Sequence, residues 1–323
     1  MQQPLVVAEE LSKVFAANGA SAVRAVDGVS FAMVRGETLA LVGESGCGKS
    51  TTGRLLMRLI EPTGGKIRFD GVDLMSLSGK DLKRERRRLQ LVFQDPYSAF
   101  NPRMTAEAVI AEPMLLAGMP APERRERVSE LLPLVGLARH HAPRYPHQFS
   151  GGQRQRIGIA RALALRPEFI VCDEPVSALD VSVQAQVINL LVDLQQEFGL
   201  TYLFISHDLR VVRHIADRVA VMYLGRIVEL ADKRALFREP QHPYTQLLLS
   251  AVPQIRPALA ASPRQVVSGE IGVATPGNGC RFAGRCPLVN DVCRETQPSL
   301  RPIASGHEVA CHLVGAAGIE ARP

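Results

Sequence analysis

The stretch that decides the fold is "TLALVGESGCGKST" at residues 38–51, where a short apolar run leads into a glycine-rich turn and then into a lysine and two hydroxyl residues. It fits the pattern G-x-x-x-x-G-K-[ST] as Gly43, Gly48, Lys49 and Ser50, between an expected strand and an expected helix. Glycines let the backbone turn its N–H groups inward around phosphate oxygens, and the start of the following helix adds partial positive charge. The pattern therefore predicts a phosphate-binding loop, whose residues are Gly43, Glu44, Ser45, Gly46, Cys47, Gly48, Lys49, Ser50 and Thr51.

Hydrolysis of a bound triphosphate also needs a metal ligand and a group that activates water. We expect Lys49 to reach the terminal phosphates and Ser50 to ligate Mg²⁺. The apolar run "FIVCDE" at residues 169–174 ends in two acids, and as a buried strand it brings both to the sheet edge that carries the phosphate loop. We expect Asp173 to be the acid on the metal side and Glu174 to be the general base. The sequence thus predicts an ATPase site that uses ATP and Mg²⁺.

Apolar runs without polar alternation predict strands that are covered on both faces, and hence a largely parallel sheet flanked by helices. Two β-like runs in the first 35 residues predict an N-terminal antiparallel β subdomain. Between about residues 101 and 164 strand runs are lacking, and amphipathic stretches such as "ERRERVSELLPLVGL" predict an inserted helical subdomain. The expected fold class is α/β. The apolar runs lie at residues 38–42, 89–94, 168–174 and 201–207.

Composition restricts the class of protein. Of 323 residues 46% are apolar, and 38 basic against 32 acidic residues give a formal charge of +6. Because the basic residues are spread along the chain, no nucleic-acid partner is expected, and "KRERRR" at residues 83–88 is interpreted as a solvated helix face. No apolar stretch reaches the roughly 18 residues of a membrane-spanning helix, and the N-terminus lacks a signal-peptide pattern. These features predict a cytoplasmic protein.

A second glycine motif, "FSGGQRQR" at residues 149–156, precedes the pair of acids. It resembles the signature motif of ABC ATPases, with Phe149 where leucine is commonest. Ser150 is expected to cap a helix whose first N–H groups face an anion. In the family that anion is the γ-phosphate of a nucleotide held by the opposite subunit, so the resemblance implies the P-loop NTPase fold of an ABC cassette and a site shared by two subunits. It adds four nucleotide-binding residues, namely Ser150, Gly151, Gly152 and Gln153.

Other elements of the family follow in the same order along the chain. Gln94 in "VFQDP" resembles the Q-loop glutamine, which contacts magnesium or water and couples to the transport domain. Residues 177–180 ("SALD") resemble the D-loop, with Asp180 as a nucleotide-binding residue. His207 in "ISHD" resembles the switch histidine, and Phe15 matches the aromatic residue that stacks on adenine. The resemblance implies a catalytic set of Glu174, His207 and Gln94, and an Mg²⁺ set of Ser50, Gln94 and Asp173.

Four of the six cysteines fall within the last 44 residues, at Cys280, Cys286, Cys293 and Cys311. In a reducing compartment such a cluster is interpreted as metal ligands before disulfides. Its spacing is unlike the paired C-x-x-C knuckles of most structural zinc sites. Four thiolates suit either a [4Fe–4S] cluster or zinc, and four unligated thiols are a third reading. The resemblance described next favours a structural iron–sulfur cluster.

The C-terminal part narrows the family further. "REPQHPYTQLLLSAVP" at residues 238–253 and "DPYSAFNPR" at residues 95–103 are similar to segments of the ATP-binding subunits of oligopeptide and dipeptide permeases. We therefore expect an ABC ATPase domain over residues 1–240. From Pro240 onward prolines recur and helix signals fade. Residues 241–323 are expected to form a C-terminal extension of the oligopeptide-transporter type, with a proline-rich linker and the four cysteines.

This resemblance implies ATP hydrolysis that energises uptake of dipeptides or oligopeptides across the cytoplasmic membrane. The implied partners are a second, non-identical ABC ATPase subunit, two transmembrane permease subunits and a periplasmic or extracellular substrate-binding protein. The chain would then lie at the cytoplasmic face of the inner membrane, held there by the permease. Two alternatives stay open: an importer of the same class that carries nickel or glutathione, and a cytoplasmic ABC ATPase without a permease.

Overall fold

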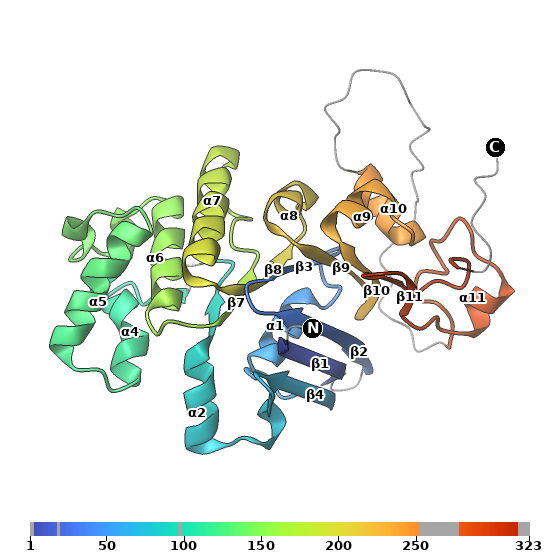
Figure 1. The fold of residues 1–323 in the computed structure, drawn as a ribbon, viewed down its shortest axis with the longest axis horizontal. Coiled ribbons are helices and arrows are strands. Elements are labelled where there is room, and N and C mark those ends of the chain that lie inside the picture. Colours follow the sequence, from blue (N-terminus) through green and yellow to red (C-terminus); the bar gives the residue numbers. More distant parts are fainter. Residues whose placement is uncertain (1–2, 18–19, 96–98, 252–277, 316–323) are drawn as a thin grey trace.

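A large mixed sheet forms the centre of the molecule (Figure 1). The computed structural model describes residues 3–17, 20–95, 99–251 and 278–315. The strands of this sheet are β3 (Thr38–Val42), β6 (Leu89–Val92), β7 (Phe169–Asp173), β8 (Thr201–Ser206), β9 (Arg218–Tyr223), β10 (Arg226–Asp232), β11 (Arg301–Ala304) and β12 (His307–Val309). Their order is β11-β12-β10-β9-β3-β8-β7-β6. The pairs β3–β8, β3–β9, β7–β8 and β6–β7 are parallel, so the predicted parallel core is confirmed.

The parallel strands are covered on both faces, which explains their continuous apolar runs. Every residue of β3, β7 and β8 is buried. Leu39 and Leu41 of β3 pack in a cluster with the N-terminal strands. Ala40 and Val42, which alternate with them, pack in a second cluster with the segment that follows β8. Alternate side chains of β3 thus pack into two different hydrophobic clusters. A polar side chain in such a strand needs a buried hydrogen-bond partner.

The predicted N-terminal antiparallel subdomain is confirmed as a four-stranded sheet of order β2-β1-β4-β5. Its strands are β1 (Pro4–Ala17), β2 (Ala20–Val34), β4 (Gly64–Phe69) and β5 (Val72–Asp73). The first 35 residues supply only two of these strands, because the chain returns to this sheet after the first helix. In β4, "GGKIRF", only Ile67 and Phe69 are buried. Such a short half-exposed strand lacks the continuous apolar run that marks the central strands.

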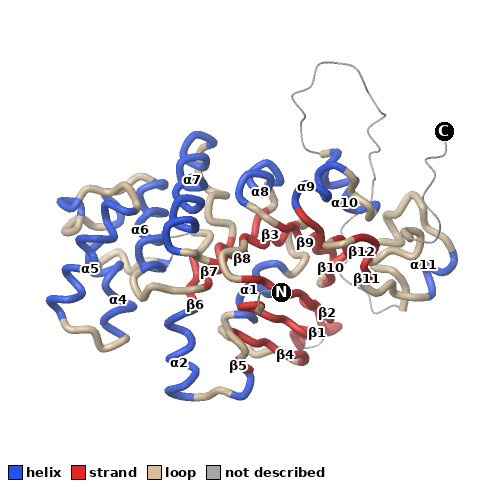
Figure 2. Tube along the Cα trace, in the orientation of Figure 1, coloured by secondary structure: helices blue, strands red, loops and turns tan. Residues whose placement is uncertain are grey.

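Helices cover the main sheet, and α4, α5 and α6 form a helical part beyond the end of the sheet that carries β6 and β7 (Figures 1 and 2). The helices are α1 (Lys49–Leu56), α2 (Gly79–Arg88), α4 (Ala106–Leu116), α5 (Ala121–Leu134), α6 (Gly151–Leu163), α7 (Val181–Phe198), α8 (Leu209–Ile215), α9 (Lys233–Arg238), α10 (Pro243–Ser250) and α11 (Asp291–Glu295). Helices α4, α5 and α6 lie where the sequence predicts helices, and their side chains share one core with β7, β8 and α7. Among the described residues no helix combines the length and apolarity needed to cross a membrane.

The C-terminal part continues the main sheet. β12 pairs antiparallel with β10, and β11 pairs with β12. The fully buried carboxylate of Glu229 in β10 accepts hydrogen bonds from the backbone N–H groups of Gln241 (2.8 Å) and His242 (2.9 Å), and it lies 2.8 Å from Nε2 of His307 in β12. One buried acid therefore joins the end of the cassette to the tail.

The C-terminal part contains a helix that the sequence did not predict, and part of it lies outside the described residues. The fading of helix signals after Pro240 is misleading, because α10 begins with Pro243 at its first position, where proline is well tolerated. The expected proline-rich linker falls on residues 252–277, outside the described residues. The domain division at residues 240 and 241 stays a prediction, and strands from beyond it belong to the same sheet as the cassette.

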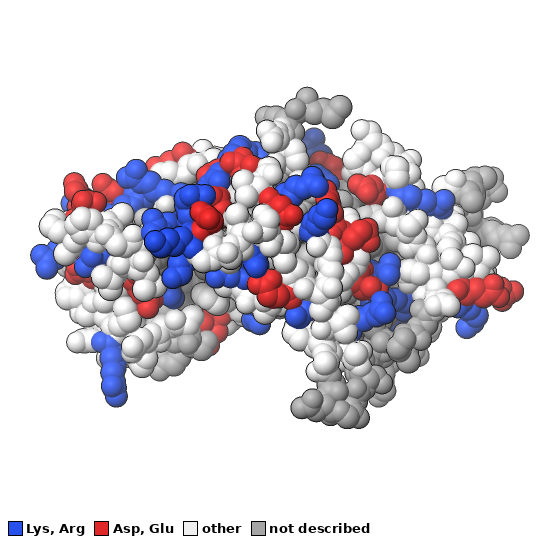
Figure 3. All heavy atoms as spheres, turned by 90° about the horizontal axis from the view of Figure 1, so that it is seen from below, with Lys and Arg blue, Asp and Glu red and all other residues white. Residues whose placement is uncertain are grey.

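The basic run at residues 83–88 lies in α2, but its last residue is not merely solvated. Arg88 lies 2.5 Å from carboxylate oxygens of both Asp70 and Glu168 and 2.9 Å from that of Glu85. The guanidinium group thus ties α2 to the N-terminal sheet and to the start of β7. On the face seen from below, Lys and Arg are interspersed with Asp and Glu (Figure 3).

Replacing Glu229 with alanine should lower the free energy of unfolding by about 3 kcal/mol, because the part-buried N–H of Gln241, the buried N–H of His242 and the ring of His307 lose their acceptor. Urea-induced unfolding of the full chain measures this change. Glu239→Ala removes a nearby exposed acid and should leave the free energy of unfolding unchanged. Equal stability of the two variants would contradict the role of Glu229 as the joint.

Candidate functional site

The phosphate loop between β3 and α1 lies in close contact with the backbone of β9 on one side and of β2 on the other. Gly43 has φ 154° and Gly48 has φ 106°, values that favour glycine. A Cβ on Gly43 would lie 2.2 Å from the carbonyl oxygen of Met222 in β9, and one on Gly48 would lie 2.1 Å from that of Ala25 in β2. Both glycines are therefore required by close approach as well as by backbone conformation.

The loop's lysine is held by the loop itself. Nζ of Lys49 donates to the carbonyl oxygens of Gly43 (2.9 Å) and Glu44 (2.8 Å), and the side chain is buried. A buried ammonium group needs such acceptors. Phosphate oxygens would offer it stronger, charge-assisted hydrogen bonds.

Two predicted magnesium ligands lie in contact. Ser50 in the first turn of α1 donates its hydroxyl hydrogen to Oδ1 of Asp173, at 2.7 Å, at the end of β7. Asp173 is buried, and burial raises the pKa of its carboxyl group, although the hydrogen bond from Ser50 opposes that shift. A hydroxyl and a carboxylate oxygen are hard ligands of the kind Mg²⁺ takes, so this pair fits the predicted ion.

The three predicted catalytic residues meet at one carboxylate. Nε2 of Gln94 donates to Oε2 of Glu174 at 3.0 Å, and Nδ1 of His207 lies 3.4 Å from Oε1 of the same residue. Glu174 has φ 47°, and its N–H donates to the carbonyl of Ile205 in β8 at 3.0 Å. A left-handed conformation in a residue other than glycine is uncommon and recurs at functional sites. The structure places Gln94 against Glu174, and its role as a magnesium ligand stays a prediction.

The signature motif begins α6 as expected. Ser150 accepts from the N–H of Gln153 at 3.3 Å, and the Gln153 side chain accepts from the N–H of Ser150 at 3.1 Å, which forms a capping box. A Cβ on Gly152 would lie 2.4 Å from Val183 in α7, and one on Gly151 would lie 3.3 Å from the side chain of Leu179. The glycines thus let α6 pack closely on the D-loop and α7.

The signature and the phosphate loop of one chain lie apart. Figure 1 shows α6 within the helical part of the molecule and α1 beneath the central sheet. Ser150 itself is exposed. The N-terminus of α6 is therefore open to an anion that another molecule brings.

The expected roles of Asp180 in nucleotide binding and of Phe15 in adenine stacking stay predictions. Asp180 directly precedes α7 but makes no side-chain capping hydrogen bond. Phe15 in β1 pairs with Val23 in β2, two residues from the Ala25 carbonyl that touches the phosphate loop. The residue is 43% exposed, so it is accessible for stacking. The remaining Q-loop residues, Pro96 to Ser98, lie outside the described residues.

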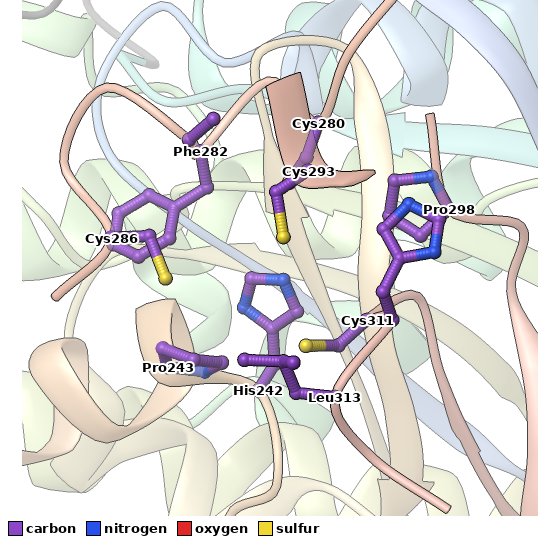
Figure 4. A pocket seen from close by; sticks show the side chains of 11 residues that line it. His242, Pro243, Cys280, Phe282, Cys286, Cys293, Pro298, Cys311 and Leu313 are labelled. Carbon is purple, nitrogen blue, oxygen red and sulfur yellow. The ribbon is translucent and has the colours of Figure 1, made fainter. Parts of the chain in front are cut away.

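The four C-terminal cysteines line one small cavity, together with His242 and Phe282. In Figure 4 the sulfur atoms of Cys286, Cys293 and Cys311 point toward the space beside the His242 ring. Burial lowers the pKa of His242 to about 4, so its imidazole is neutral. Among the described residues, however, no three Cys, His, Asp or Glu side chains are placed to hold one metal ion. The sequence-predicted thiols are thus gathered, without a ready site for a single ion.

Two residues that contact the phosphate loop were not predicted. Arg285 pairs with the carboxylate of Glu44, and the hydroxyl oxygen of Tyr244 accepts from the N–H of Glu44. They stand 241 and 200 residues further along the chain. No motif spacing joins such distant positions, and only the fold brings them to the loop.

Known proteins resemble this chain over nearly its whole length. Residues 26–177 match the ABC transporter family, and residues 228–293 match the C-terminal region of oligopeptide/dipeptide transporters. The oligopeptide transport ATP-binding protein AppF of Bacillus subtilis is 56% identical over 295 residues, which cover 90% of each chain.

Two solved structures share the cassette fold. A dimeric ATP-binding cassette in a post-hydrolysis state with ADP and Pi is 31% identical, with a TM-score of 0.65 over 71% of this chain and 99% of that one. The protein cbiO1 of Clostridium perfringens, part of the ABC transporter complex cbiONQ, is 28% identical, with a TM-score of 0.66 over 74% of this chain and 92% of that one.

Asp173→Asn should stabilise the nucleotide-free protein by about 1 kcal/mol near neutral pH, because the buried carboxylate costs free energy there. The pKa of Asp173 is raised in the folded state, so the wild type loses stability as pH rises through that pKa, and the gain should vanish in acid. Thermal unfolding at both pH values measures it. The exposed Asp193→Asn should shift neither curve, and an unstabilised Asp173→Asn protein at neutral pH would refute the expectation.

Proposed function

This chain belongs to the ATP-binding proteins of ABC transporters, and we propose that it hydrolyses ATP to drive the import of dipeptides or oligopeptides. The observation that carries this proposal is the cluster at the end of β7. There Asp173 contacts the Ser50 hydroxyl, and the next residue, Glu174, contacts both Gln94 and His207. A metal-side acid and a water-activating base thus stand side by side, beside the phosphate loop.

Each group has a separate task in hydrolysis. Inward N–H groups of the loop and Lys49 would bind the phosphates, and Ser50 and Asp173 would hold Mg²⁺. Bound Mg²⁺ would supply neutralisation of charge on the phosphate oxygens. Glu174 would take a proton from the attacking water, and its contact with His207 fixes where that carboxylate points.

The working site requires two subunits. The α6 N-terminus is exposed and distant from the chain's own loop, so a second cassette must bring its own signature to the phosphates. The partner is proposed to be a similar but non-identical ATPase subunit. A pair of domains that closes only around triphosphate has a higher affinity for nucleotide in its closed state than in its open state. This difference in affinity supplies the free energy that drives transport.

The remaining partners follow from the family of peptide importers. They are two transmembrane permease subunits and a periplasmic or extracellular substrate-binding protein, and the chain is proposed to lie peripherally at the cytoplasmic face of the inner membrane. Nickel and glutathione remain alternative cargoes, because cargo meets the binding protein and the permease and not this chain. Co-purification with membrane proteins separates this function from a cassette that works without a permease.

For the cysteine cavity we propose a structural [4Fe–4S] cluster. The four cysteines line one cavity, which supports a group that all four thiolates share. Four thiolates suit the four irons of such a cluster, and zinc stays the alternative.

Glu174→Gln should leave the Kd for ATP within about twofold of wild type and lower kcat at least about a hundredfold, because an amide cannot take the proton. Nucleotide titration and steady-state hydrolysis measure the two quantities. Glu197→Gln, at an exposed position near the C-terminal end of α7, should retain normal turnover. Wild-type hydrolysis by the Glu174 variant would remove this residue as the base.

Cys293→Ser should remove most of the iron and labile sulfide from anaerobically purified protein, together with its broad visible absorbance. Cys293 is a buried member of the cavity. Cys47→Ser serves as the control, because Cys47 lies in the phosphate loop and away from that cavity. Stoichiometric zinc, or neither metal, in the wild-type protein would overturn the cluster.

A further inference from the structure

The segment "CRFAGRC" at residues 280–286 faces two sites at once. Its terminal residues, Cys280 and Cys286, line the cysteine cavity. Its interior residue Phe282 is buried and packs against Tyr223 and Tyr244, with ring centroids 5.3 and 5.5 Å away. The two arginines of the segment point instead into the nucleotide-binding part. The C-terminal extension therefore reaches the ATP site through a defined stretch of chain.

Arg285 makes a two-pronged contact with the phosphate loop. Its Nη1 and Nη2 atoms lie 2.9 and 3.0 Å from the two carboxylate oxygens of Glu44. The Arg285 side chain is 13% exposed and that of Glu44 is 23% exposed. The guanidinium carbon lies 5.9 Å from the centre of the Tyr223 ring. A bidentate pair that is shielded in this way fixes orientation as well as distance.

Tyr244 fixes the same loop residue through the backbone. Its hydroxyl oxygen accepts from the N–H of Glu44 at 3.0 Å, and the residue is fully buried. The carbonyl of Glu44 accepts from Lys49 (2.8 Å) and from the N–H of Cys47 (3.3 Å). All the polar groups of Glu44 are thus engaged, and two of the partners come from beyond residue 240.

Arg281 connects the same segment to the β9–β10 turn and to β2. Arg281 contacts Asp27 in β2 and the carbonyl of Leu224. The next residue, Gly225, donates to the carbonyl of Cys47 in the phosphate loop at 2.8 Å. The extension and the loop are therefore joined through the β9–β10 turn as well.

We propose that Arg285 and Tyr244 are positioning residues that hold the first turn of the phosphate loop in its nucleotide-binding conformation, so that the C-terminal extension sets the affinity for ATP. This inference rests on the proposed nucleotide function of the loop. Its physical basis is preorganisation: the inward N–H groups bind phosphate best when the outer side of the loop is already fixed.

The test compares ATP binding and steady-state hydrolysis in full-length variants. Arg285→Ala should raise Kd and KM for ATP about tenfold, Arg285→Lys less, and Tyr244→Phe about threefold, with kcat within about twofold of wild type. Such a split identifies positioning, because a merely structural role would lower the active fraction, and hence kcat, without raising KM.

Two further variants make the result specific. If Arg285 acts through Glu44, adding Glu44→Gln to Arg285→Ala should raise Kd no further. Arg238→Ala, an exposed arginine in α9, should bind ATP normally. Equal unfolding temperatures of the variants without nucleotide confirm that the comparison is between folded proteins.

Lys49→Ala separates failure of this inference from failure of the function. If Lys49→Ala loses ATP binding while Arg285→Ala and Tyr244→Phe keep the wild-type Kd, the positioning role is wrong and the nucleotide site stands. If Lys49→Ala also binds like the wild type, the phosphate-loop function and the positioning role are overturned together.

Discussion

The close approach of the phosphate loop to two neighbouring backbones is the constraint on which the rest of the structure depends. Met222 in β9 and Ala25 in β2 leave no space for a Cβ at Gly43 and Gly48. The loop is therefore fixed between the parallel sheet and the antiparallel sheet, and α1 must start at their junction. Ser50 then meets Asp173 because both lie at the carboxyl ends of parallel strands in one sheet, Ser50 after β3 and Asp173 at the end of β7, with β8 between the two strands.

This arrangement divides binding from chemistry within a few residues. Asp173 is buried, and burial raises the pKa of its carboxyl group. Glu174 has an uncommon backbone conformation, and its carboxylate contacts Gln94 of the Q-loop and the switch histidine, His207. The first acid can serve the ion and the second the water. In the proposed pair of subunits, completion of the phosphate site is left to α6 of the second subunit, because in this chain that helix lies in the helical part, apart from α1.

The sequence predicted what is encoded locally. Glycine spacing identified the phosphate loop, continuous apolar runs identified β3, β7 and β8, and Ser150 identified the start of α6. Contacts between distant segments gave no such signal. Arg285 and Glu44 meet across 241 residues, and β12 joins the sheet with only three residues. The four cysteines were singled out, but spacing alone could not show that they share a cavity.

The segment from Cys280 to Cys286 has a consequence for how this gene can change. Its cysteines must reach one cavity while its arginines reach Asp27 and Glu44, so the number of residues between these contacts is fixed. Surface loops accept added or lost residues at small entropic cost, but here a single inserted residue would move one end of the segment out of register. Among descendants of this gene, the length of that interval should therefore vary less than its composition.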